Sequence, residues 1–146
     1  MEVKIIMDDK YTTPSIVIYT NQMTPEIQAL VNNLRIDHTK QVLGYNGGEV
    51  FIIEPTAISR IHTEGNKVIA VCEEGSYQLK NRIYEIDENP PTRYFIRISN
   101  SEIVNFEKVK SLDLSITGTI TLKFKNGQKT YVSRRYVDKI KTHLGI

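Results

Sequence analysis

The 146-residue chain has one cysteine, no tryptophan and no long apolar run. The single cysteine, Cys72, excludes an internal disulfide framework and a zinc site built from several cysteines. No stretch approaches the ~20 apolar residues that a membrane span needs, and charges interrupt the first nine positions, unlike a secretory signal. The length and a 40% hydrophobic content fit one compact domain, or one domain with a small appendage. We therefore expect a cytoplasmic protein.

Residues that could perform catalysis are few and scattered. His38, His62 and His143 show no metal-ligand spacing, and no Gly-x-Ser-x-Gly motif is present. Cys72 lies in an apolar run, which favours a buried, unreactive thiol over a nucleophile. The sequence thus predicts a protein that is not an enzyme and has no cofactor, metal or small-molecule substrate.

Charge is divided unevenly along the chain. Residues 1–90 contain 8 Lys/Arg and 13 Asp/Glu (net −5), whereas residues 91–146 contain 11 and 4 (net +7), which leaves the whole chain at +2. A basic third of this kind suggests a face that meets a polyanion, most often nucleic acid. A solvated basic surface balanced by the acidic part explains the same numbers, so composition leaves both interpretations open.

Residues 1–44 are predicted to form a small β-β-α extension. Alternating or β-branched residues favour strands over 3–7 and 15–19, and the Thr-Pro-Glu sequence at 24–26 indicates the start of a helix that extends to residue 35. Two strands and one helix are too few for an independent core. We therefore expect this extension to dock on a partner or on the rest of the chain.

Residues 45–146 are predicted to be mainly β, so the chain is α+β overall. Gly47-Gly48 indicates a hairpin turn, because no Lys-Ser/Thr follows it as in a phosphate-binding loop. Apolar segments separated by turn residues predict four strands between residues 50 and 79. Helical spacing predicts a short helix within 80–87 and a final helix at 134–144.

A further hairpin is indicated at Asn126-Gly127, which follows a segment of alternating apolar and polar residues. A two-residue type I′ loop there places Leu122 opposite Tyr131 and turns both inward. An inward Tyr131 argues against single-stranded RNA binding, which uses exposed aromatic side chains for stacking.

Polar side chains fall at two predicted turns. Asn66 and Lys67 lie between two strands, and Ser99-Asn100-Ser101 interrupts two apolar segments. Side chains at such turns are candidates for ligand contact, since loops held by a rigid scaffold often carry function.

The start of the last helix is basic. Ser133 is a candidate N-cap, and Arg134 and Arg135 follow it. Two cations oppose the positive end of the helix dipole, which costs stability unless an anion such as phosphate lies nearby. Ion pairs with Glu102 or Asp138 are the structural alternative.

Two segments together resemble the LytTR DNA-binding domain of bacterial response regulators. Residues 94–105, Tyr-Phe-Ile-Arg-Ile-Ser-Asn-Ser-Glu-Ile-Val-Asn, are similar to the family's pattern of Phe, Arg, apolar, His, polar or basic, Ser, aromatic, apolar, Val, Asn. The second segment is Asn126-Gly127 followed by Tyr-Val-Ser-Arg-Arg-Tyr at 131–136 and an apolar-periodic helix. The similarity covers roughly residues 45–146.

The resemblance implies a multi-stranded β fold whose loops, rather than a recognition helix, enter the major groove. Family members bind direct repeats in promoters, commonly as dimers, and bend the DNA. The expected function is therefore sequence-specific transcription regulation, with promoter DNA and a second copy as partners. Two positions depart from the pattern: Ser99 replaces the usual His, and Glu102 replaces an aromatic residue and adds negative charge near the presumed DNA face.

On the same resemblance, three loops supply the base contacts, through Asn66, Asn100 and Arg135. Arg can donate a bidentate pair to guanine, and Asn can pair with adenine. Other candidate interface residues lie beside these three or suit phosphate contacts, namely Lys67, Ser101, Lys123, Lys125, Lys129, Ser133 and Arg134.

Short LytTR proteins without a receiver domain resemble regulators that a small membrane protein holds inactive. In that arrangement residues 1–44 contact a membrane-bound inhibitory partner or a second copy. Packing of this extension on the DNA-binding sheet is equally open. The alternative function is a protein-interaction module whose basic face binds an acidic protein.

Overall fold

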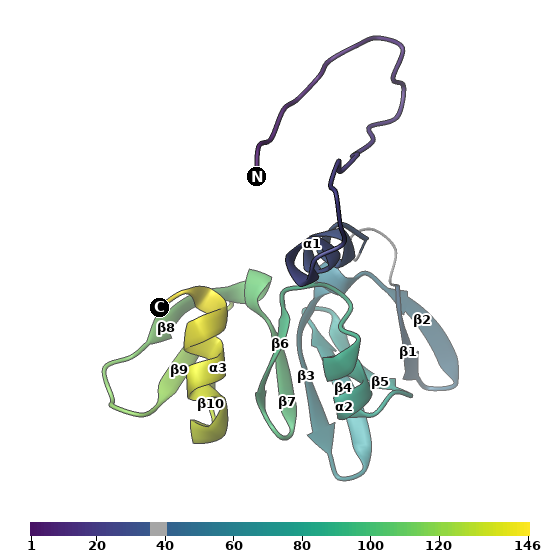
Figure 1. Ribbon diagram of the computed structural model, residues 1–146. Coiled ribbons are helices and arrows are strands. Elements are labelled where there is room, and N and C mark those ends of the chain that lie inside the picture. Colours follow the sequence, from purple (N-terminus) through teal and green to yellow (C-terminus); the bar gives the residue numbers. More distant parts are fainter. Residues whose placement is uncertain (36–40) are drawn as a thin grey trace.

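The computed structural model describes residues 1–35 and 41–146. Within these ranges the strands form two antiparallel sheets that lie side by side (Figure 1). The larger sheet has seven strands in the order β2-β1-β5-β4-β3-β7-β6. Its strands are β1 (Val42–Asn46), β2 (Glu49–Ile53), β3 (Ile58–Glu64), β4 (Lys67–Cys72), β5 (Gly75–Leu79), β6 (Phe95–Ser99) and β7 (Glu102–Asn105).

The smaller sheet has three strands in the order β10-β9-β8. Helix α2 packs against β3, β6 and β7, and helix α3 packs against β6. The remaining elements are α1 (Pro25–Arg35), the 3-10 turn η1 (Pro55–Ala57), α2 (Ile83–Glu88), the 3-10 turn η2 (Phe106–Lys108), β8 (Val109–Asp113), β9 (Ile120–Phe124), β10 (Lys129–Val132) and α3 (Arg134–Leu144).

Strands β6 and β7 contribute to two hydrophobic cores. Phe95 and Ile103 face the first core, which the larger sheet forms with α2. Ile96, Ile98 and Val104 face the second core, which includes the smaller sheet and α3. Because successive side chains of a strand point to opposite faces, these two strands are buried on both sides. The β6–β7 hairpin is therefore the central layer of the domain.

The structure confirms the mainly β fold class with short helices. Gly47 and Gly48 have φ of 59° and 84° and join β1 to β2 in a two-residue turn, as a type I′ hairpin requires. Helices α1, α2 and α3 occupy the three segments predicted to be helical. Strand β1 begins at Val42, so the larger sheet includes the last residues of the segment assigned to the extension. His38 lies outside the described residues.

The prediction of strands over residues 3–7 and 15–19 is wrong. In the structure residues 1–24 contain no strand and run away from the sheets (Figure 1). Most of their apolar side chains are exposed, and only Ile18 and Thr24 are half-buried. The local pattern favours an extended backbone, but a strand also needs a partner to pair its amide and carbonyl groups, and this segment has none in the described parts of the chain.

The turn at Asn126-Gly127 is not the predicted type I′ loop. Gly127 has φ of 90°, but Asn126 does not have the positive φ that this loop type requires. The Gly127 N–H donates to the Phe124 carbonyl at 3.0 Å, and the Phe124 N–H donates to the Gln128 carbonyl at 2.8 Å. A four-residue turn that ends in a left-handed glycine adds one residue to the loop as a bulge.

The extra residue shifts the β9–β10 register by one position. Thr130, not Tyr131, lies opposite Leu122, and Tyr131 lies opposite Thr121. A one-residue shift exchanges the two faces of a strand, so Thr130 is buried and Tyr131 is 68% exposed. The predicted inward position of Tyr131 is therefore wrong, and the argument that it gave against stacking with nucleic-acid bases no longer holds.

Candidate nucleic-acid interface

Three segments that are distant in the sequence meet at one end of the domain. These are the β3–β4 turn, the β6–β7 turn and the first turn of α3, at the lower side of Figure 1. The Thr63 N–H donates to the Ser101 carbonyl at 2.9 Å, which ties the first turn to the second. The Tyr136 hydroxyl donates to Asn100 Oδ1 at 3.2 Å, which ties the second turn to α3. We call these three segments the loop end.

The β3–β4 turn presents Asn66 and Lys67. Glu64 pairs with Lys67 across the hairpin, and Gly65 takes φ of 60° at the first loop position. A glycine with positive φ at this position suits a tight two-residue hairpin. Both Asn66 and Lys67 are exposed at the tip.

The β6–β7 turn presents Asn100 and Ser101, both exposed. Arg97 holds its backbone, because Arg97 Nε donates to the Ser99 carbonyl at 3.1 Å and Nη2 donates to the Asn100 carbonyl at 2.7 Å. The same guanidinium lies 3.5 Å from Asp87 Oδ2 of α2. Arg97, which is mostly buried, thus holds the backbone of the turn from its inner side. The side chains of Asn100 and Ser101 remain in solvent.

The start of α3 is basic, as the sequence predicts. Ser133 is the N-cap residue, but its hydroxyl makes no capping hydrogen bond, and the first turn has no acidic residue. Arg134 and Arg135 are exposed and form no ion pair within residues 1–35 and 41–146, so the predicted structural alternative with Glu102 or Asp138 is not what the structure shows. An uncompensated basic pair at a helix N-terminus favours a bound anion.

Glu102 does not add charge to the exposed loop surface. Its side chain is 12% exposed, forms an ion pair with Arg60 at 3.1 Å and accepts a hydrogen bond from the Thr130 hydroxyl at 2.7 Å. These contacts join β3, β7 and β10, and so connect the two sheets. At this position the chain therefore has a partly buried polar bridge between the sheets.

Lys123 is not part of the loop end. It lies in β9 opposite Lys129, on the face that also carries Tyr131. Lys129 precedes Ser133 by four positions, which corresponds to about 13 Å of extended strand. Lys123 and Lys129 also lower the pKa of the Asp113 carboxyl, although the largest cause is the hydrogen bonding of Ser115 to it.

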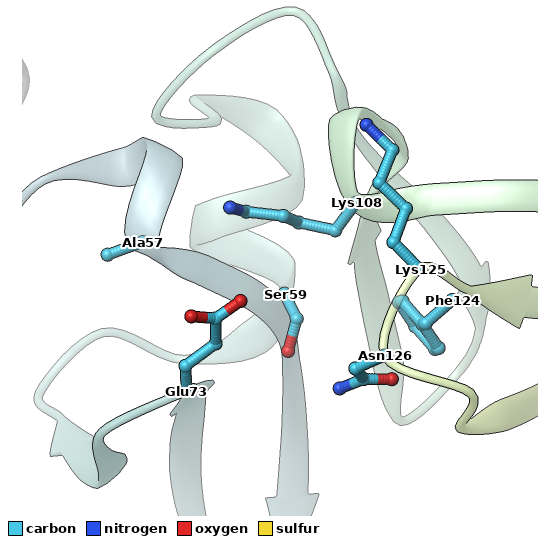
Figure 2. A pocket seen from close by; sticks show the side chains of 7 residues that line it. All are labelled: Ala57, Ser59, Glu73, Lys108, Phe124, Lys125 and Asn126. Carbon is cyan, nitrogen blue, oxygen red and sulfur yellow. The ribbon is translucent and has the colours of Figure 1, made fainter.

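A small pocket lies between the two sheets, near the β9–β10 turn (Figure 2). Its lining includes Glu73, Lys108, Lys125 and Asn126. This turn is at the opposite end of β10 from Ser133, so the pocket is separate from the loop end. Within the described ranges no group of three or more His, Cys, Asp and Glu residues is arranged to hold a metal ion.

Cys72 is half-buried at the end of β4. Burial raises the pKa of its thiol, and the Glu74 carboxylate raises it further. The thiolate form that a nucleophile requires is therefore disfavoured.

Sequence reasoning missed Arg97 and Tyr136, which orient the loop end. Both lie inside the two segments that resemble the LytTR domain, at the Arg position of the first and at the last residue of the second. Their roles depend on contacts between β6, α2 and α3 that no local pattern encodes.

A mainly β domain that presents amide and basic side chains from two turns and an adjoining helix start has features expected of a nucleic-acid-binding protein. The sequence profile of the LytTr DNA-binding domain matches residues 48–145. The chain belongs to the LytTR family.

Relatives and a solved structure agree with this assignment. The chain is similar to an uncharacterized HTH-type transcriptional regulator of Staphylococcus aureus strain MSSA476, with 32% identity over 100% of this chain and 99% of the relative. A second regulator of that type, from strain NCTC 8325, is 31% identical with the same coverage. A solved LytTr DNA-binding domain from Bacillus cereus has a TM-score of 0.69 at 23% identity, and the match covers 74% of this chain and 100% of that domain.

This protein is therefore a DNA-binding transcriptional regulator, and the alternative of a module that binds an acidic protein is not favoured. The S. aureus relatives are named helix-turn-helix proteins, but in the described part of this chain strands separate each helix from the next. None of the described helices combines the length and apolar content that crossing a bilayer requires.

Proposed function

We propose that this regulator reads promoter sequences through Asn66, Asn100 and Arg135. The observation that carries this proposal is the pair of hydrogen bonds that hold the three turns side by side, from Thr63 to Ser101 and from Tyr136 to Asn100. Three turns that adjoin can approach one stretch of duplex together. Arg and Asn are the side chains that most often recognise guanine and adenine in the major groove.

Phosphate contacts come from the polar and basic residues beside these three. Contacts of this kind fix the register of the protein on the duplex without reading its sequence. Two features support an anion at the start of α3: the Ser133 hydroxyl makes no capping hydrogen bond, and Arg134 forms no ion pair with the described residues. The proposed contacts are completed by Lys67, Ser101 and, further away, Lys123.

We propose that two copies bind direct repeats. Direct repeats require both copies to face the same way, so their contact is head-to-tail rather than symmetric. Equivalent contacts in successive major grooves require repeats spaced by about 10 base pairs or a multiple of that length.

Residues 1–23, which we call the N-terminal segment, are proposed to be a protein-contact surface, for a second copy or for a membrane-bound inhibitory protein. Their exposed apolar side chains support this proposal, among them Val3 and Ile5, which are 83% and 86% exposed. Apolar surface of this extent is unfavourable in water and is typical of interaction sites. In this proposal the protein acts in the cytoplasm, where promoter DNA is found, and performs no reaction.

Gel-shift titration of Arg135→Ala tests the proposed site. The operator is first selected from a randomised duplex pool with the wild-type chain. Loss of a bidentate contact to guanine should cost about 1–3 kcal/mol at one base position and relax discrimination there. Unchanged discrimination between operator and random DNA would exclude the role assigned to Arg135.

Lys141→Ala is the matched control, because it removes the same charge from the exposed last turn of the same helix. We expect it to weaken all sequences slightly and to leave discrimination unchanged. An equal loss of discrimination in both variants would assign the effect to net charge rather than to a base contact.

Sedimentation velocity tests the N-terminal segment as a contact surface. The double substitution Ile16→Asp and Val17→Asp introduces charge into the exposed run and should reduce self-association of the free protein if the partner is a second copy. If the wild-type chain is monomeric, the second-copy proposal for this segment is wrong, and the membrane-bound partner is the proposal that is left.

A further inference from the structure

We propose that Tyr136 determines which base Asn100 reads, by engaging one end of its side-chain amide. This inference rests on the proposed role of Asn100 in base recognition. It assigns to Tyr136 a positioning role that sets specificity without a contact to DNA.

The surroundings of Asn100 orient its side-chain amide. Its Oδ1 accepts a hydrogen bond from the Tyr136 hydroxyl at 3.2 Å. Its Nδ2 donates no hydrogen bond within residues 1–35 and 41–146, and the residue is exposed. The acceptor end of the amide is therefore directed toward α3, and the donor end is available to a ligand.

Contacts with neighbouring residues fix the position of the Tyr136 side chain. Its ring packs against the second core, and its backbone N–H donates to the Ser133 carbonyl at 2.9 Å. Lys139 Nζ lies 5.7 Å from the ring centroid and 3.9 Å from Asp87 Oδ1. A ring fixed by packing gives its hydroxyl a defined position, so little rotational freedom is lost when it donates to Asn100.

The backbone of Asn100 is fixed independently. Arg97 donates to the carbonyls of Ser99 and Asn100, and Asp87 holds Arg97. Asp87 therefore contacts both the residue that holds the turn and Lys139, which lies over the Tyr136 ring. The amide and its partner hydroxyl therefore belong to one network of contacts.

This orientation changes the chemistry of recognition. An asparagine that reads adenine must accept a hydrogen bond from N6 through Oδ1 and donate to N7 through Nδ2. With Oδ1 directed toward Tyr136, the amide meets the groove mainly as a donor. Guanine presents two neighbouring acceptors, O6 and N7, so the arrangement favours guanine over adenine at the position that Asn100 contacts.

Selection from a randomised duplex pool with the full chain identifies the operator, and competition among the four bases at each position then measures specificity. We compare the wild type with Asn100→Ala, which identifies the position that Asn100 reads, and with Tyr136→Phe, which removes only the hydroxyl. The wild type should prefer guanine over adenine at that position by roughly fivefold or more. In Tyr136→Phe the freed Oδ1 should reduce this preference to below about twofold or reverse it toward adenine.

A merely structural role of Tyr136 would lower affinity for every sequence by the same factor, and that result overturns the inference. A preference for adenine in the wild type overturns it as well. If Asn100→Ala and Arg135→Ala both leave specificity unchanged, the proposed function itself fails. If they relax specificity and Tyr136→Phe does not, only the role of Tyr136 fails.

Two further variants strengthen the test. Asn100→Asp keeps an acceptor for the Tyr136 hydroxyl but has no donor for the groove, so the guanine preference should disappear. Tyr84→Phe removes a hydroxyl from an exposed tyrosine of α2 that does not belong to the loop end, and it should leave specificity unchanged. Thermal unfolding of each variant establishes that it is folded at the temperature of the binding assay.

Discussion

The N-terminal segment and the loop end both lie in solvent, but they expose opposite kinds of surface. The N-terminal segment exposes apolar side chains, and its hydrogen bonds join residues that are two or three positions apart. The loop end exposes amide, hydroxyl and guanidinium groups. Its hydrogen bonds join residues separated by up to 38 positions, as from Thr63 to Ser101.

This difference shows what holds the exposed side chains of each surface in place. At the loop end, buried groups behind the surface fix the exposed ones, so binding a rigid duplex there requires little additional ordering. In the N-terminal segment only Ile18 is half-buried against the described parts of the chain, so a contact with another protein would have to supply most of the burial and order. In the proposed function, the loop end is therefore ordered before it meets DNA, whereas the N-terminal segment would gain its structure from a partner.

The largest effect is expected when the support of the loop end is broken at Glu102. Replacing Glu102 by Ala leaves the Arg60 guanidinium and the Thr130 hydroxyl without their acceptor. Removing one partner of a fully buried pair costs about 3–5 kcal/mol, but Arg60 is 31% exposed and regains water, so we expect a loss of about 2 kcal/mol of unfolding free energy. Urea unfolding at neutral pH measures it.

Glu107→Ala is the control for Glu102→Ala, since Glu107 is an exposed carboxylate in the neighbouring η2 turn. Exposed substitutions of this kind usually change stability by less than about 0.5 kcal/mol. Equal stability of the two variants would mean that the partly buried bridge between the sheets does not stabilise the domain.

Two glycine turns show how far the sequence alone predicts the fold. Gly47-Gly48 can adopt positive φ at both positions, so the type I′ turn and its register follow from the residues themselves. At Asn126-Gly127 only the glycine takes positive φ, and the same pair of residues fits a bulged turn one residue longer. Packing of alternate residues against the second core selects between these registers, and that choice depends on residues far away in the sequence.

The candidate site shows the same limit. The basic pair at the start of α3 and the amide at Asn100 are visible as residue types at the ends of predicted elements. Their adjacency is not, because it depends on the contacts of Arg97 and Tyr136 between elements. The pairing of Glu102 with Arg60, 42 positions away, could not be predicted from the sequence either. The Glu102 carboxylate was expected near the DNA surface but is partly buried between the sheets.

A smaller effect is expected at Lys123, which lies outside the loop end. Lys123→Ala should weaken binding to all duplexes by a similar factor and reduce the slope of log affinity against log salt by about 0.9, the value for one phosphate contact. Gel shifts of operator and random duplexes at several salt concentrations measure both quantities. A selective loss for the operator would place Lys123 among the residues that read bases and would extend the recognition surface onto the smaller sheet.

The smallest effect is expected from deletion of residues 2–23. In this segment only Ile18 is half-buried, so its removal should change the unfolding free energy of the domain by less than about 0.5 kcal/mol at low protein concentration. Any contribution from self-association should instead appear as a melting temperature that rises with concentration in the full chain but not in the shortened one. Urea unfolding and thermal melts over a hundredfold range of concentration separate the two effects. A loss of stability that is independent of concentration would mean that this segment packs on its own domain, and its contrast with the loop end would disappear.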